Sequence, residues 1–147
     1  MSDWIKAARL RTLPLSLSGI IMGSFLARWR LSEDGKFWDW KIFALALLVT
    51  LLYQILSNYA NDYGDGVKGT DLQRLNEAEK RAVASGRITE KQMKNAVILF
   101  AFLSLAATFA LLYLAFIPDY TKEFFIFVGL GVASILAAIG YTIGKKP

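Results

Sequence analysis

Four long apolar stretches, separated by shorter or more polar segments, dominate the pattern of this chain. They cover residues 13–29, 42–59, 96–116 and 124–143. Each stretch is close to the roughly 20 residues that an α-helix needs to cross a bilayer. The pattern therefore predicts an all-α fold, a polytopic membrane helix bundle with four transmembrane helices in 147 residues.

Small residues recur within two of the predicted helices. Gly19 and Gly23 lie four residues apart in the first, and Gly129 and Gly131 lie in the fourth. Small residues at helical spacing allow the backbones of membrane helices to approach closely. We expect these positions to serve as packing faces.

The second apolar stretch runs directly into a series of amides and carboxylates. Asn58, Asn61, Asp62 and Asp65 fall at i, i+3, i+4 and i+7, so a helix that continues past residue 59 would place them on one face. Polar groups at this depth usually line a bundle interior or an aqueous cavity. We expect this face to be a catalytic or binding site, although an acidic cluster that only solvates a helix end remains an alternative.

Composition narrows the chemistry available to such a site. The chain is 55% hydrophobic, above the roughly 45 to 50% of ordinary soluble domains. It contains neither cysteine nor histidine, which excludes thiol nucleophiles and thiolate or imidazole metal ligands. A metal would be held by oxygen atoms, and this favours a hard cation such as Mg²⁺.

The net charge of +5 follows membrane topology, so no nucleic-acid partner is expected. Twelve of the 17 Lys and Arg residues lie before the first helix, in the loop after the second or beyond the fourth. The other five lie in the loops on the opposite side. Because basic residues concentrate on the cytoplasmic side, we expect a multi-pass protein of the inner cell membrane with both termini and the Asp-rich loop in the cytoplasm.

The Asp-rich segment offers ligands for a metal and an anion together. Carboxylates at Asp62, Asp65 and Asp71 can hold Mg²⁺ and leave positions for water and phosphate oxygens. Nearby cationic side chains, those of Lys68, Arg74 and Arg81, can neutralise an anionic group. Diphosphate is the natural candidate, and a metal-bound diphosphate is also a good leaving group.

The motif NDYGDGVKGTD at residues 61–71 resembles the first aspartate-rich motif of the UbiA superfamily of intramembrane prenyltransferases. Three further segments agree: WIKAARLRTLPLSLSG at 4–19, RAVASGRIT at 81–89 and YTIGKKP at 141–147. The resemblance spans the whole chain and is strongest to the branch that prenylates 1,4-dihydroxy-2-naphthoate in menaquinone biosynthesis. Residues 72–80, LQRLNEAEK, depart from the loop of that branch.

The resemblance implies a Mg²⁺-dependent reaction in which a polyprenyl group moves from polyprenyl diphosphate to 1,4-dihydroxy-2-naphthoate, with decarboxylation, giving demethylmenaquinone. It implies catalytic roles for Asp62 and Asp65. The implied metal ligands are Asn61, Asp62 and Asp65. The implied substrate-binding residues are Asn58, Asn61, Lys68, Asp71, Arg74, Arg81 and Lys145.

Family members have about nine membrane helices and a second aspartate-rich motif that this sequence lacks. Residues 1–147 are therefore expected to be the amino-terminal part of a UbiA-type domain, inactive alone, and a second chain carrying the carboxy-terminal half is one explanation. Two alternatives stay open. The first is that the chain is a noncatalytic four-helix membrane protein, such as a scaffold or a small ion-binding transporter. The second is that it belongs to another UbiA branch.

Overall fold

The structure, a computed structural model, describes residues 3–35, 37–68, 82, 83 and 85–143. Within these ranges the protein is helical and contains no strand. The elements are α1 (Asp3–Ala8), a 3-10 turn η1 (Leu10–Thr12), α2 (Leu13–Glu33), α3 (Trp40–Lys68), α4 (Glu90–Phe116) and α5 (Thr121–Ile143). The all-α prediction is confirmed.

Four segments are long and apolar enough to cross a membrane, as predicted. They are Asp3–Glu33, Trp40–Val67, Glu90–Phe116 and Thr121–Gly140. Backbone groups in hydrocarbon must be satisfied within their own segment, which a continuous helix achieves. The protein is a multi-pass membrane protein with a helical bundle.

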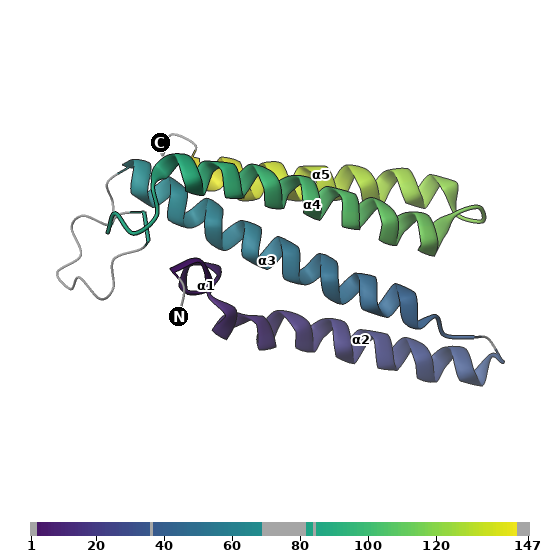
Figure 1. Ribbon diagram of the computed structural model, residues 1–147. Coiled ribbons are helices and arrows are strands. Elements are labelled where there is room, and N and C mark those ends of the chain that lie inside the picture. The colour runs from purple at the N-terminus through teal and green to yellow at the C-terminus, as the bar shows by residue number, and fades with distance from the viewer. Residues whose placement is uncertain (1–2, 36, 69–81, 84, 144–147) are drawn as a thin grey trace.

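Helix α3 lies at the centre of the arrangement and contacts each of α1, α2, α4 and α5. In Figure 1, α3 runs between α2 on one side and α4 with α5 on the other. Helix α1 is short and lies beside the later part of α3. Helix α5 ends where α3 ends, so one end of the bundle gathers α1, the end of α3, the start of α4 and the end of α5.

Burial is concentrated at that same end. The core cluster includes Leu56, Tyr59 and Ala60 of α3 together with Met93 and Val97 of α4. It also takes in Ala7, Ala8, Ala82, Val83, Ile88 and Ile135. Farther along the bundle many large apolar side chains are exposed on the helix surfaces, as expected where lipid is the neighbour.

Of the four glycines predicted to pack, only Gly131 has a close neighbour among the described residues, and a Cβ built on Gly129 would meet no heavy atom within 4 Å. A Cβ built on Gly19 or Gly23 would meet no heavy atom within 4 Å, so the α2 strip is not used as a packing face by the described residues. At Gly131 a Cβ would lie 3.1 Å from Thr108 Cγ2. There the Tyr53 hydroxyl donates to the Gly131 carbonyl oxygen at 3.0 Å, and this bond joins α3 to α5 inside the apolar region.

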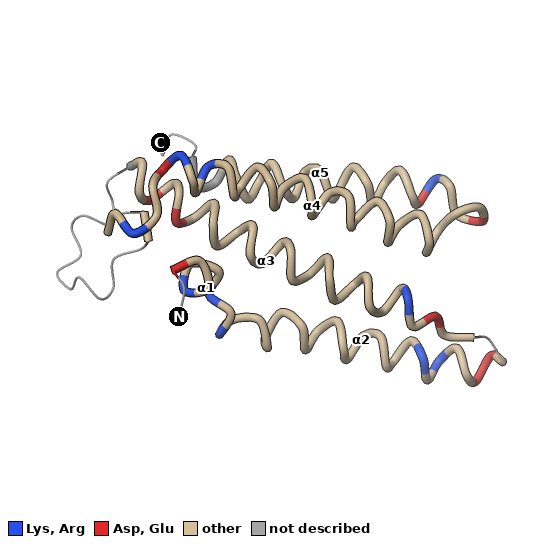
Figure 2. Tube along the Cα trace, in the orientation of Figure 1, with Lys and Arg blue, Asp and Glu red and all other residues tan. Residues whose placement is uncertain are grey.

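Charged residues occupy the two ends of the bundle and leave the middle apolar (Figure 2). At the end where α3 finishes, the described basic residues are Lys6, Arg9, Arg11, Lys68, Arg87, Lys91 and Lys94. At the opposite end they are Arg28, Arg30, Lys41 and Lys122. Both ends therefore match the water-facing boundaries that the hydrophobic lengths predict.

Candidate active site

The polar face predicted at the end of the second span lies on one continuous helix. Helix α3 runs unbroken to Lys68, nine residues beyond the predicted end of the apolar stretch, so Asn58, Asn61, Asp62 and Asp65 share a face as expected. Asn58 is 5% exposed and Asp62 is 3% exposed. Asn61 and Asp65 are partly exposed.

Asp62 is bound to the backbone of the segment that leads into α4. The Ala82 N–H donates to Asp62 Oδ2 at 3.2 Å, and the Val83 N–H donates to Asp62 Oδ1 at 3.2 Å. Hydrogen bonds to a charged acceptor are stronger than neutral ones. The carboxylate therefore joins the end of α3 to a segment 20 residues later in the chain.

Residues 82, 83 and 85–88 are linked by backbone hydrogen bonds into a turn, which we call the 82–88 turn. The Gly86 N–H donates to the Val83 carbonyl oxygen at 2.9 Å, and the Ile88 N–H donates to the Ala82 carbonyl oxygen at 3.1 Å. Gly86 has a positive φ of 71°, which glycine adopts without strain. A capping box of Thr89 and Gln92 then begins α4.

Gly66 allows this turn to lie directly against α3. A Cβ built on Gly66 would overlap the Val83 Cγ1 atom and lie 2.8 Å from the Val83 Cβ atom. Gly66 lies one helical turn beyond Asp62 on α3. Because Gly66 has no side chain, there is room for Val83 against the helix.

Asn58 holds the other neighbour of this site, helix α1. Its Nδ2 donates to the carbonyl oxygen of Ala8 at 2.9 Å. Ala8 ends α1, where carbonyl groups lack partners within the helix. The Tyr59 hydroxyl also donates to the Trp4 carbonyl oxygen at 3.3 Å, and Asp3 pairs with Arg87 at 3.7 Å, so α1, α3 and the 82–88 turn are mutually linked.

The structure describes only part of the predicted site. Asn58, Asn61, Asp62 and Asp65 are brought together on α3. Lys68 ends that helix, but its side chain lies outside what the structure describes. Asp71, Arg74, Arg81 and Lys145 lie outside the described residues.

The donor set present suits a magnesium site that is shared with a substrate. Within residues 3–35, 37–68, 82, 83 and 85–143, no group of three or more Asp, Glu, His or Cys side chains converges as an all-protein metal cage would. Mg²⁺ is usually bound through one or two carboxylates together with substrate phosphates and water. The carboxylate and amide oxygens of the α3 face fit that requirement.

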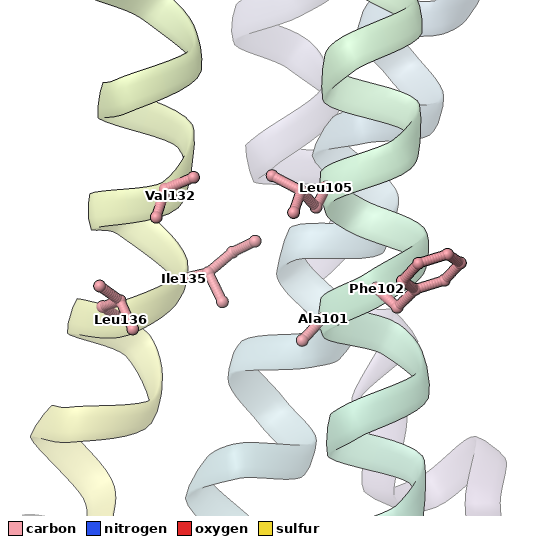
Figure 3. Close-up of a pocket in the computed structure, with 6 residues that line it drawn as sticks. All are labelled: Ala101, Phe102, Leu105, Val132, Ile135 and Leu136. Atoms are coloured by element: carbon pink, nitrogen blue, oxygen red, sulfur yellow. The ribbon is translucent and has the colours of Figure 1, made fainter.

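A separate hollow between α4 and α5 is wholly apolar. Figure 3 shows Leu105 and Ile135 pointing toward one another between these helices. The lining residues are Ala101, Phe102, Leu105, Val132, Ile135 and Leu136. With only apolar residues in its lining, this hollow offers nothing to hold a diphosphate.

Sequence reasoning missed two features of the site, the docking of α1 and the backbone partners of Asp62. The segment RAVASGRIT contains those partners, but a backbone N–H leaves no signal in a sequence. Gly66, placed one turn after Asp62, was the available hint that another backbone or side chain comes close.

Comparisons with known proteins identify the family of this chain. The UbiA prenyltransferase family matches residues 17–147. Proteins named 1,4-dihydroxy-2-naphthoate octaprenyltransferase are similar over almost the whole chain. The Escherichia coli protein is 41% identical, and the match covers 98% of this chain and 44% of the relative. The Haemophilus influenzae protein is 38% identical, and the match covers 98% of this chain and 45% of the relative.

The protein of that name from Mycobacterium tuberculosis is 32% identical over 99% of this chain and 45% of its own length. The chain thus spans about 45% of the length of the curated relatives it matches. No solved structure matches it. The family match covers most of the chain, including the polar face that ends the membrane-spanning helix α3. The chain therefore belongs to the UbiA prenyltransferase family.

Proposed function

We propose that this protein is the amino-terminal part of a prenyltransferase that moves a polyprenyl group from polyprenyl diphosphate to 1,4-dihydroxy-2-naphthoate. The observation that carries the proposal is the polar end of α3, where amides and carboxylates continue directly from a bilayer-spanning helix. The names of the relatives supply the acceptor and an octaprenyl group. A membrane boundary suits this donor, which has a charged diphosphate and an apolar tail.

In this proposal the α3 face binds the diphosphate end of the donor. Asn61 and Asp65 lie one helical turn apart and are partly exposed, so their oxygen atoms can hold Mg²⁺ beside the diphosphate, with Asp62 next to them as the third predicted ligand. Bound Mg²⁺ would supply positive charge that stabilises the leaving group. Lys68, Asp71, Arg74, Arg81 and Lys145 keep their predicted substrate-binding roles as part of the proposal.

The proposed reaction is balanced without a redox partner. The bond between the allylic carbon and the diphosphate oxygen breaks, and the diphosphate keeps the electron pair. The ring carbon that bears the carboxylate then supplies an electron pair to the allylic carbon, and carbon dioxide leaves. The product is the prenylated naphthalenediol, the reduced form of demethylmenaquinone. The apolar part of α3 keeps the prenyl tail in lipid and away from water.

We place the protein in the inner cell membrane with its termini and the α3 site on the cytoplasmic side. The support is the charge distribution: the end of the bundle that carries the site has more basic residues than the opposite end. Basic residues accumulate on the cytoplasmic side of membrane proteins. A cytoplasmic site would also face the compartment that holds soluble aromatic acids and magnesium.

Catalysis is proposed to require the part of the domain that corresponds to the remaining length of the relatives. This chain spans about 45% of that length. A single polar face on α3 surrounds only one side of a diphosphate, so we expect weak binding and little turnover until a second set of ligands closes the site. That set would come from further sequence or from a second chain.

The test is complementation in liposomes. We would reconstitute this chain with the part of the Escherichia coli relative that it does not match, and add Mg²⁺, polyprenyl diphosphate and 1,4-dihydroxy-2-naphthoate. We expect prenylated product only when both parts are present. Bound Mg²⁺ would stabilise the charge on the leaving diphosphate in the transition state by several kcal/mol. Because Asp65→Asn removes a proposed Mg²⁺ ligand, it should lower turnover by about a hundredfold or more.

Two controls make the result decisive. The E. coli relative, divided at the same boundary, must be active under the same conditions, which shows that a divided domain can assemble. Gly19→Ala in this chain should leave turnover unchanged, because none of the described residues of this chain lies within 4 Å of the added Cβ. If the divided relative works and this chain does not, a noncatalytic membrane protein becomes the better account.

A further inference from the structure

Both oxygens of the Asp62 carboxylate are held by backbone groups of a neighbouring segment. Each of its oxygens accepts a backbone N–H, one from Ala82 and one from Val83, both at 3.2 Å. It is 3% exposed, whereas Asp65 is partly exposed. A residue that binds a metal beside a substrate must present an oxygen to open space, and Asp62 presents little surface.

The 82–88 turn depends on this carboxylate for its hydrogen bonding. The carbonyl oxygens of Ala82 and Val83 accept bonds from Ile88 and Gly86 within the turn. The N–H groups of Ala82 and Val83 donate to Asp62, and both residues are buried. Buried N–H groups nearly always have a partner, because leaving one unpaired is costly.

Helical geometry divides the polar face into two rows. With 3.6 residues per turn, Asn58, Asp62 and Gly66 follow one another along one row, and Asn61 and Asp65 lie in the row beside it. Every member of the first row contacts a neighbouring segment of this chain. Asn58 donates to Ala8, Asp62 accepts from the 82–88 turn, and Gly66 receives Val83.

We infer that Asp62 is a positioning residue, whose carboxylate fixes the 82–88 turn against α3 and leaves the metal and diphosphate contacts to Asn61 and Asp65. The ligand assignment rests on the proposed function. The attachment of the turn does not, because it follows from the two hydrogen bonds and the burial of Asp62. The first row thus builds one wall of the site, and the second row does the binding.

The attachment can be tested on the full chain in lipid nanodiscs, without any substrate. Hydrogen–deuterium exchange would be followed at the Ala82 and Val83 amides in the wild-type protein, Asp62→Asn and Asp65→Asn. The asparagine side chain keeps one accepting oxygen but turns an NH₂ group toward the other backbone N–H. Losing one such bond should speed exchange of these amides by about tenfold in Asp62→Asn, whereas Asp65→Asn should leave them unchanged.

Three results would overturn the inference. The first is equal exchange of these amides in Asp62→Asn and wild type. The second is equal deprotection of the same amides in Asp65→Asn, which would indicate general loosening of the helix end. The third needs no variant: wild-type Ala82 and Val83 amides that exchange as fast as an unstructured peptide.

The ligand assignment has its own readout, the Mg²⁺ concentration that half-saturates turnover in the complemented liposomes. Asp62→Asn should lower the maximal rate and change the half-saturating Mg²⁺ concentration by no more than about twofold. Asp65→Asn should raise the half-saturating Mg²⁺ concentration about tenfold or more. An equal rise in both variants would make Asp62 a ligand and overturn the division of roles. The exchange result does not depend on prenyl transfer, so a failure of the proposed function would be recognised separately.

Discussion

Both ends of the bundle carry acidic residues, but Asp62 at one end differs from Glu33 and Asp34 at the other in its exposure and in its partners. At the end where α2 finishes, Arg30 pairs with Glu33 at 3.2 Å and with Asp34 at 3.4 Å, and these carboxylates are 48% and 39% exposed. At the end where α3 finishes, Asp62 is 3% exposed and bound to backbone N–H groups. Burying a carboxylate is costly unless it is hydrogen-bonded. Asp62 meets this condition through its two backbone partners, whereas the carboxylates at the α2 end remain in contact with water.

The aromatic residues at the two ends also differ in what they contact. At the α2 end, Phe25, Trp38 and Phe43 pack together, and the Arg28 guanidinium lies 5.6 Å from the centre of the Trp38 ring, an arrangement typical of an interfacial anchor. At the α3 end, Tyr59 packs edge-on against Trp4 and hydrogen-bonds to its backbone. The first cluster anchors the bundle in the interface, and the second fastens α1 beside the site.

The largest effect on stability should come from Asp62→Ala. The substitution leaves two buried N–H groups without their acceptor, which should lower the free energy of unfolding by about 3 kcal/mol. Reversible unfolding in mixed micelles, followed by tryptophan fluorescence, measures this. A loss below about 0.5 kcal/mol, the level of an exposed ion pair, would remove the difference between the two ends.

A smaller loss is expected for Gly66→Ala, because the new methyl group would push Val83 away from α3. Overpacking of this kind should cost about 2 kcal/mol of unfolding free energy. The double variant Gly66→Ala, Val83→Ala should recover part of that loss, giving a coupling energy of about 1 kcal/mol.

The matched control for Gly66 is Gly23→Ala in α2. Its added Cβ would meet no heavy atom within 4 Å in the part of the chain that the structure describes, so it should not lower the unfolding free energy. Equal losses at Gly23 and Gly66 would show that helical glycines, and not the contact with Val83, explain the result.

Asn58→Ala should have a moderate effect that is confined to α1. Loss of the bond to the Ala8 carbonyl oxygen should cost about 1 kcal/mol and speed amide exchange across residues 3–8. Ser18→Ala is the control, because the Ser18 hydroxyl donates to Leu15 within its own helix. If α1 exchanges as slowly in Asn58→Ala as in wild type, other contacts hold it in place.

The smallest effect should be found at the opposite end, in Arg30→Ala. Exposed ion pairs contribute little, so the unfolding free energy should change by less than about 0.5 kcal/mol. A loss above about 1 kcal/mol would mean that the α2 end also depends on its charges, and the contrast between the ends would then be one of degree.

The spans, the helix type and the polar face were all predictable from the sequence. Each depends on properties that act locally: the length of an apolar stretch, the 3.6-residue period and the identity of residues one turn apart. Those properties predicted α3 and the shared face of Asn58, Asn61, Asp62 and Asp65, and the motif at residues 61–71 identified the family. The packing role predicted for Gly19, Gly23 and Gly129 was wrong for the described residues, because small size permits an approach without supplying a partner.

What only the tertiary structure decided is which segments the polar residues hold. Asp62 binds N–H groups 20 and 21 residues away, and Asn58 binds a carbonyl oxygen 50 residues away. Every non-proline residue carries the same backbone groups, so the sequence contains no mark of the ones that a side chain will meet. The path of the chain brings α1 and the 82–88 turn to the end of α3, and that path separates the residues that build the site from those proposed to bind within it.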